Sequence, residues 1–456
     1  MSNSYATFIR IAVQLLKQYD RITMNRISKT LIMFIFFAFS STAISAEEVC
    51  DSVPTNSLNI EDNDSLIFYP LPKIETDYSV APNFNATEIP LDSIPLFRKA
   101  PKWLRDYLNS LLNGNVDKTF EKPVDLGFAI VPSYSKESSF GLSGAMTGSY
   151  RVNKTDSTLQ PSNFSASLSA SLLGSFDFTA KGNHIFSDHR SRLTYKAELY
   201  SKHLDFWGVT AEATRNNRKS PSEYTRRQAD LTAEYKYRLN SRFYIGANAR
   251  ANYTAAKKVG NIEYLNNERD NYFVTGLGLS LEFDSRNDLV TPSKGVYLAY
   301  KPMIFPQFMG NASSTFYSHN IIADGYFKMW KGSVLAIDVY AKLNSNNTPW
   351  TMREMVAGDW NRMRGYYMGS TIDNNQISTQ IELRQHIWHR FGFVVWGGGA
   401  SFFSNFDQLK RQKINDILYN YGIGLRFEFK HNTNIRLDWG FGKDTNAVIV
   451  TIGEAF

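Results

Sequence analysis

Apolar and polar residues alternate almost without exception between Ile417 and Phe456. The apolar positions of the first run are Ile417, Tyr419, Tyr421, Ile423, Leu425, Phe427 and Phe429. The even positions from Asn420 to Glu428 carry glycine or polar residues, two of them charged. Period two predicts strands with one apolar and one polar face. A packed core would reject those charges, and the aromatic face is too large to leave in water. The pattern therefore favours a wall between lipid and an aqueous lumen.

Similar runs continue back to about residue 139, and we interpret about sixteen of them as strands. The first predicted strand is Phe140–Arg151, the last is Ala447–Phe456, and Phe206–Thr214 lies between them. The predicted fold class is all-β. It is a transmembrane antiparallel β-barrel of about 16 strands, assigned to residues 126–456. An N-terminal extended segment with one short helix precedes it.

The first 46 residues have the layout of a secretory signal peptide. Arg26 and Lys29 precede the apolar run Leu31–Phe39, and small residues lead to a cleavage position near Ala46. The apolar run is too short to span a bilayer as a helix. Met24 is an alternative start of translation, and an N-terminal membrane anchor is the alternative function.

Residues 47–125 differ from the barrel because they are polar and rich in proline. The prolines are Pro54, Pro70, Pro72, Pro82, Pro90, Pro95, Pro101 and Pro123. Such a composition predicts a mostly extended or irregular periplasmic segment. One helix is predicted near 101–113, with Trp103 and Leu108 on its apolar face. This helix either covers the mouth of the barrel or docks a periplasmic or outer-membrane partner.

Charge and chemistry exclude several classes of function. Residues 1–46 hold five Lys/Arg and one Asp, so the net charge of +7 falls to +3 in the mature chain. That charge is too small to indicate a nucleic-acid partner. Cys50 is the only cysteine, and no GxSxG, HExxH or CxxC motif occurs. We therefore expect no enzyme, no metal and no cofactor. Glu382 and Arg384 on one lumen face could suggest acid–base chemistry, but a structural lumen network is favoured.

Three stretches together resemble the bacterial surface antigen barrel of the BamA/TamA superfamily, over residues 139–456. The first holds Asp284 and Arg286, followed by Pro292 and Gly295 at a strand turn. The second is Met363-Arg364-Gly365-Tyr366, inside a connection at about 344–374. The third runs from Gly422-Ile423-Gly424-Leu425-Arg426 through Arg436-Leu437-Asp438-Trp439-Gly440 to the end. The resemblance implies a sixteen-stranded barrel that assembles or translocates proteins at the bacterial outer membrane, without a cofactor.

The resemblance also implies that Arg364, Gly365 and Tyr366 lie on a loop that folds back into the lumen. A buried guanidinium needs a carboxylate of matching geometry. By the alternation of their strands, Glu382 and Asp438 point inward. We expect Arg364 to pair with Glu382, with Asp438 as second choice, and Arg426 and Arg436 to be further lumen partners. The family's Asp on the next strand is replaced within Gly397-Gly398-Gly399, which leaves a second carboxylate for Arg364 open.

Well-studied members of the family carry periplasmic POTRA repeats upstream of the barrel. This sequence departs from that pattern. The prolines of residues 47–124 argue against such a repeat, and we expect a barrel-only member.

In the family, a client strand adds to a weak seam between the first and last strands. Here the seam would join Phe140–Arg151 to Ala447–Phe456, and the loop ion pair would stiffen the wall opposite it. Phe456, Ile452 and Val450 form a C-terminal barrel signal. The expected partners are outer-membrane lipid and nascent outer-membrane proteins. An accessory subunit of a larger complex and a passive pore are the alternatives.

Overall fold

The computed structural model describes residues 101–102, 106, 118–135, 139–359, 361–388, 390–430 and 433–456. The chain divides into two compact units, residues 1–72 with 406–412, and residues 73–405 with 413–456. The second unit contains the sheet described below. The predicted signal peptide, and Trp103 and Leu108 of the predicted helix, lie outside the described residues.

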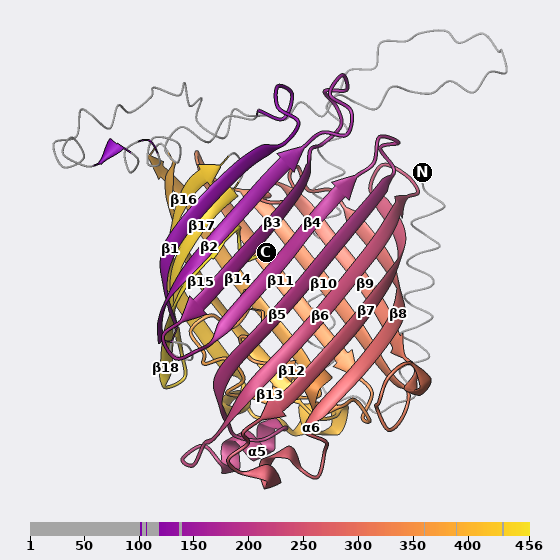
Figure 1. The fold of residues 1–456 in the computed structure, drawn as a ribbon, viewed down its shortest axis with the longest axis vertical. Helices are drawn as coiled ribbons and strands as arrows, with labels where there is room; N and C mark the ends of the chain where they lie inside the picture. The colour runs from indigo at the N-terminus through magenta and orange to yellow at the C-terminus, as the bar shows by residue number, and fades with distance from the viewer. Residues whose placement is uncertain are drawn as a thin grey trace. The chain divides into compact units, whose positions relative to one another are not determined.

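Sixteen strands form one antiparallel sheet in which every strand pairs with its neighbours in chain order (Figure 1). They are β1 (Asp125–Ser135), β2 (Ser139–Tyr150), β3 (Ser162–Ser171), β4 (Phe176–Ile185), β5 (Ser191–Phe206), β6 (Ser222–Arg238), β7 (Phe243–Lys257), β8 (Asn271–Asp284), β9 (Gly295–Phe305), β10 (Phe316–Lys328), β11 (Ser333–Asn344), β14 (Asn375–Trp388), β15 (Phe391–Phe403), β16 (Leu418–Lys430), β17 (Thr433–Gly442) and β18 (Thr445–Ile452).

The connections hold the remaining elements. A two-stranded sheet pairs β12 (Glu354–Met355) with β13 (Ile372–Asp373). The short helices are α5 (Ala211–Asn216), α6 (Phe406–Arg411), η2 (Ile262–Leu265), η3 (Gln307–Met309), η4 (Trp350–Met352) and η5 (Ile414–Asp416). Among the described residues, no helix has the length and apolar character needed to cross a bilayer.

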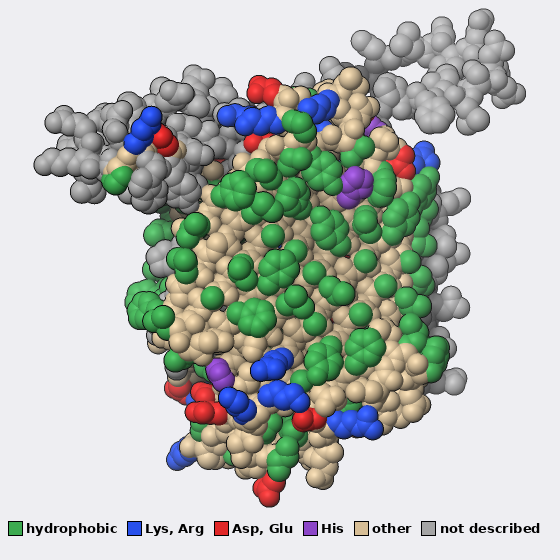
Figure 2. Space-filling model, viewed as in Figure 1, with side chains coloured by type: hydrophobic (Ala, Val, Ile, Leu, Met, Phe, Trp, Pro, Cys, Tyr) green, Lys and Arg blue, Asp and Glu red, His purple; other side chains and the backbone are tan. Residues whose placement is uncertain are grey.

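The large sheet carries apolar side chains on its outer face and polar side chains on its inner face, the reverse of a water-soluble protein. Cross-strand neighbours such as Ile423 and Trp439 lie on the outer face, and about half of each side chain is exposed. On the inner face of β17, Asp438 is fully buried. Figure 2 shows a broad band of apolar and uncharged side chains, with most charges gathered beyond its two ends. Apolar-out and polar-in alternation is the arrangement of a transmembrane barrel, so the predicted all-β fold class is confirmed.

The count of sixteen is right, but one predicted strand is wrong and one was missed. The range Phe206–Thr214 is not a strand, because β5 ends at Phe206 and Gly208 adopts a φ of +121°. Thr210 then caps α5 by accepting a hydrogen bond from the N–H of Ala213 at 3.1 Å. Such a cap satisfies a backbone group that a helix start leaves unpaired.

The missed strand is β1, which pairs with β2 along its whole length. Pro132 lies in β1, and proline cannot donate to a strand ladder. The sheet order begins at β1, so this strand is at an edge, where a missing N–H is tolerated.

The two ends of the sheet, β1 and β18, approach each other without a ladder between them in the described residues. Their Cα atoms come within 8 Å, yet the pairing order begins at β1 and ends at β18. The predicted seam at Phe140–Arg151 is therefore wrong, because that range is β2 and has partners on both sides. The last strand also ends at Ile452, since Gly453 adopts a φ of +94°.

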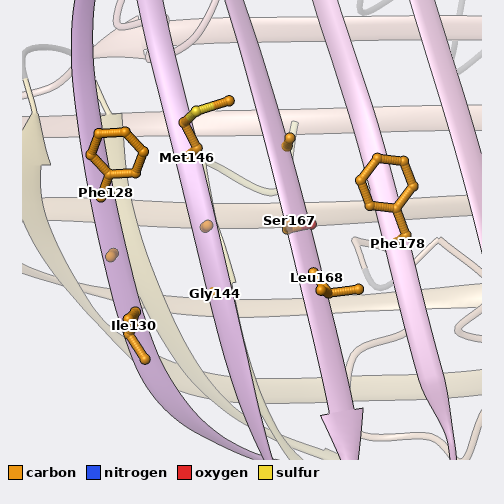
Figure 3. A pocket seen from close by; sticks show the side chains of 10 residues that line it. Phe128, Ile130, Gly144, Met146, Ser167, Leu168 and Phe178 are labelled. Atoms are coloured by element: carbon orange, nitrogen blue, oxygen red, sulfur yellow. The ribbon is translucent and has the colours of Figure 1, made fainter.

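Small side chains line the inner face of the sheet next to β1. The inner face of β2 and β3 carries Ser143, Ala145, Thr147, Ser165, Ser167 and Ser169. On the outer face, a hollow of about 310 Å³ is lined by Phe128, Ile130, Gly144, Met146, Leu168 and Phe178 among others (Figure 3). Nothing lies within 4 Å of where a Cβ on Gly144 would be. The sheet thus has small inner side chains and an outer hollow at this point.

Candidate functional site: an arginine loop on the inner wall

The connection between β11 and β14 turns inward and is tethered at its base. Glu354 of β12 lies opposite Asp373 of β13 in the backbone ladder of the two-stranded sheet. Arg353 forms an ion pair with Glu268 at 2.6 Å, and its Nη1 donates to the carbonyl of Val209 at 3.0 Å. These contacts fix both ends of the loop that carries the Arg-Gly-Tyr motif.

Asp373 makes a second tether of the loop. Its carboxylate accepts hydrogen bonds from the N–H of Ala211 at 2.9 Å, from the N–H of Asn374 at 2.7 Å and from the hydroxyl of Ser404 at 2.8 Å. Burial nevertheless raises the pKa of the Asp373 carboxyl. The bonds thus join the loop to the connections that follow β5 and β15.

The backbone at Arg364 lies directly on β17. Met363 and Gly365 both adopt left-handed backbone, with φ of +55° and +107°. For a residue such as Met363 this conformation is uncommon, and it costs of order 1–3 kcal/mol. A Cβ on Gly365 would lie 2.5 Å from the carbonyl carbon of Gly440, and one on Gly440 would lie 2.6 Å from that of Arg364. Both glycines are therefore required by the close approach of the two backbones.

The guanidinium of Arg364 bridges two carboxylates on different strands. Nη2 donates to Glu382 of β14 at 2.7 Å and Nη1 to Asp438 of β17 at 2.8 Å. All three side chains are fully buried. The structure thus brings Arg364 to both expected partners, not to one of them.

An indole fills the space around this arginine. The guanidinium carbon of Arg364 lies 3.8 Å from the centre of the Trp396 ring on β15. A cation over an indole face is attractive, more so where water is excluded. Glycine stands where the resembled family has an Asp on this strand, and Asp438 of β17 is the second carboxylate that binds Arg364.

Tyr366 secures the other side of the motif. Its hydroxyl donates to the carbonyl of Tyr419 at 2.8 Å and accepts from the N–H of Lys443 at 3.0 Å. Its ring lies so close over Gly442 that a Cβ there would overlap it. Gly440 and Gly442 of β17 thus form a flat surface for the motif.

Arg362 is a second loop anchor that sequence reasoning missed. Its Nε and Nη2 bind the two oxygens of Asp338 on β11 at 2.9 and 2.6 Å, and Nη1 reaches Asp359 at 3.0 Å. Its guanidinium carbon lies 4.1 Å from the centre of the Tyr340 ring. Strand parity alone points Asp338 inward, but the sequence does not show that Arg362 lies within reach of it. Forked pairs of this kind fix orientation as well as distance.

The carboxylates of Arg364 also bind other arginines, and this network extends to the residues after β18. Arg384 Nε donates to Glu382 at 2.8 Å, and Arg426 Nη1 donates to Asp438 at 2.6 Å. Arg426 Nε then binds Glu454 at 2.9 Å. The predicted stiffening of the wall opposite the seam is therefore wrong, because the network reaches the β18 side of it.

The segment after Gly453 turns to the inner side. Arg384 Nη2 donates to the carbonyl of Phe456 at 2.8 Å, and its guanidinium carbon lies 5.2 Å from the Phe456 ring centre. Val450 and Ile452 remain on the outer face, opposite Leu437 and Ile435. The three residues of the predicted C-terminal signal thus lie in two different environments.

Arg436, the last predicted lumen partner, contacts the loop from β17. Its Nη2 donates to Asn361 at 3.0 Å, and its Nε lies 3.4 Å from Asp438.

The strand-turn motif is a separate structural feature. Arg286 binds both oxygens of Asp284 at 2.9 Å, and Arg192 of β5 approaches the same carboxylate at 3.6 Å. Gly295 has a φ of +110° and packs against the carbonyl of Ser285. Pro292 lies in the connection between β8 and β9. These contacts shape that connection and align β8 with β5.

The fold and this site define a class: a transmembrane β-barrel with an inward arginine loop clamped to its wall. Residues 160–456 match the Omp85 superfamily domain, which is well over half of the chain. The chain belongs to the Omp85 superfamily, and this confirms the predicted resemblance to BamA/TamA-type barrels. Members of the family are outer-membrane β-barrel proteins that work with membrane lipid and substrate proteins.

Several solved structures are similar to the chain. BamA from Haemophilus ducreyi lacking POTRA domains 1–3 is 12% identical, with 73% of this chain and 70% of that one covered and a TM-score of 0.45. CdiB from Acinetobacter baumannii is 10% identical, with 77% and 67% covered and a TM-score of 0.43. CdiB from Escherichia coli is 12% identical, with 73% and 62% covered and a TM-score of 0.45. No curated protein matches the chain.

Proposed function

We propose that this protein inserts or translocates other proteins at the bacterial outer membrane, and that the client enters between β1 and β18. The observation that carries the proposal is the junction of these strands, whose Cα atoms come within 8 Å although no ladder joins them in the described residues. An unpaired strand edge is a template for another strand. Membership of the Omp85 superfamily supports the same activity.

Two features of the wall support opening at this junction. β18 is only 8 residues long, whereas β2 has 12. Its free edge therefore leaves fewer backbone groups unpaired, and unpaired backbone groups are costly in lipid. On the other side, the small residues of β2 and β3 allow the wall to bend.

The arginine loop acts, in this proposal, as a positioning element. Arg364 holds β14 and β17 together through Glu382 and Asp438. Arg426 and Arg384 continue from these carboxylates to Glu454 and Phe456, just after β18. The loop would thereby set the position of the β18 edge that meets the client. Activity of this kind requires no nucleotide, metal or nucleophile. The described part of the chain holds no cluster of His, Cys, Asp or Glu side chains that could bind a metal ion.

Cysteine crosslinking tests the proposal. Phe128→Cys on β1 is compared with Leu279→Cys on β8, because both side chains are outward-facing and are 54% and 58% exposed. Each variant also carries Cys50→Ser, so that it has a single cysteine, and is reconstituted in liposomes. An unfolded outer-membrane barrel protein with one cysteine in its last strand is then added with a bismaleimide crosslinker. We expect a strong crosslink at position 128 and little at 279.

Equal yields at the two positions would overturn the proposed entry site. Steady ion conductance without any crosslink would instead favour a passive pore. Tight co-purification with a larger complex, with neither crosslink nor conductance, would favour an accessory subunit.

A further inference from the structure

Three basic side chains surround one threonine on the outer face of β5, β6 and β7. Thr225 of β6 pairs with His203 of β5 on one side and with Lys257 of β7 on the other. Arg227 lies two residues along β6, so it projects from the same face. The Nδ1 atom of His203 and the hydroxyl of Thr225 are hydrogen-bonded at 2.9 Å. The group thus combines cations and a hydroxyl within one small area.

This face is the lipid-facing side of the sheet. Leu199 and Leu231 share it by register, and they are 40% and 53% exposed. From Leu231 toward the start of β6, Arg227 is the first charged residue on the outer face. Figure 2 shows basic and histidine side chains gathered at this border of the apolar band, on the side of β5 to β7. The border is where a bilayer changes from hydrocarbon to headgroups.

No acidic side chain among the described residues forms an ion pair with Arg227. This arginine is exposed, and no hydrogen bond or ion pair of its side chain is found among the described residues. Within the described part of the chain, Lys257 has one ion-pair partner, Asp270 at 3.6 Å, and both of these side chains are nearly half exposed. The other acidic residues of this face, Asp205 and Glu223, lie farther along their strands from the apolar band. The cations are therefore the charges that meet the membrane first.

We propose that His203, Arg227 and Lys257, with the hydroxyl of Thr225, bind the phosphate of an anionic membrane lipid in the leaflet at the α5 end of the barrel. A guanidinium binds phosphate through paired charge-assisted hydrogen bonds, and a lysine adds a point charge. The acyl chains would lie along Leu231 and Leu199, where the apolar band begins. The site is continuous with the lipid contact that the barrel already makes, and it does not depend on the proposed insertion activity.

The full-length protein in detergent, examined by native mass spectrometry, provides the test. The probes are phosphatidylglycerol, diacylglycerol with the same acyl chains, and glycerol 3-phosphate as the free headgroup. We expect wild-type protein to retain phosphatidylglycerol, and to bind neither diacylglycerol nor glycerol 3-phosphate at equal concentration. R227Q/K257Q should bind phosphatidylglycerol roughly 25-fold more weakly, since each basic residue at a membrane surface contributes about 1 kcal/mol, a factor of about five.

A matched control separates the site from net charge. R215Q/K219Q removes one arginine and one lysine at the same end of the barrel, from the connection beyond the strands. This pair should leave lipid retention unchanged, and the charge-conserving R227K/K257R should keep most of it. Equal loss in the control pair, no preference for phosphatidylglycerol over diacylglycerol, or equal binding of glycerol 3-phosphate would each overturn the proposal. If R227Q/K257Q does not fold, loss of retention in H203Q with T225V decides the question.

Discussion

Gly365 of the inward loop and Gly440 of β17 face each other so closely that neither has room for a side chain. This contact lets the backbone of the Arg364 motif lie against a strand, and it brings the guanidinium between Glu382 and Asp438.

We therefore expect Gly440→Ala to push the loop off β17. Its Cβ would lie 2.6 Å from the carbonyl carbon of Arg364, and backbone cannot yield as a side-chain tip can. Such overpacking costs about 1–3 kcal/mol. The measurement is the midpoint of urea unfolding of the barrel in detergent micelles. Gly144→Ala is the control because its new methyl group would meet nothing within 4 Å. An equal shift in both variants would contradict the role given to Gly440.

Removing the guanidinium should be more costly. Arg364→Ala leaves Glu382 and Asp438 buried with one cation fewer between them, and breaking a buried pair typically costs 3–5 kcal/mol. We expect a lower temperature for the gel-mobility change of the heated barrel, together with loss of client insertion in liposomes. Arg364→Lys should recover little, because one ammonium does not span two carboxylates as the fork does. A wild-type transition temperature for Arg364→Ala would disprove this role.

The second anchor can be measured by a double-mutant cycle. Arg362→Ala, Asp338→Ala and the double variant should give a coupling energy of roughly 0.5–3 kcal/mol, because Arg362 binds both oxygens of Asp338. The readout is the free energy of unfolding in urea. Additive effects of the two substitutions would mean that the ion pair contributes nothing to stability.

Glu454 should control how firmly the segment after β18 is held. Glu454→Gln weakens the contact with Arg426 Nε, and it removes the charge that Arg384 approaches at 3.8 Å. We expect faster amide hydrogen exchange in β18, with unchanged exchange in β6. Glu263→Gln, the same change at an exposed position of η2, is the control. If β18 exchanges at the wild-type rate, the network does not restrain that strand.

The sequence predicted most of the wall because each strand with one lipid face and one aqueous face repeats the same two-residue pattern. It predicted β16 and β17 well for this reason. It failed at β1, where Pro132 interrupts the signal and only the edge position makes the strand permissible. It also failed at Phe206–Thr214, where local capping by Thr210 outweighs a short apolar alternation.

The candidate site was partly predictable for a different reason. Glu382 and Asp438 were found because strand parity fixes which way a side chain points. Arg362 and Trp396 were missed, because their roles depend on where a long connection lies against the wall. Period and spacing carry no information on that placement. The inward turn of Phe456 likewise follows from Gly453, whose effect on direction cannot be read from alternation.

The serine- and glycine-rich arc of β2 and β3 has a mechanical consequence. On the β18 side of the β1–β18 junction, arginine–carboxylate ion pairs that link different strands resist shear between them. On the inner face of the arc, small side chains and the backbone ladder oppose bending. A load applied by the surrounding bilayer would therefore be taken up as curvature in this arc, so that one flank of the junction flexes while the other holds its shape.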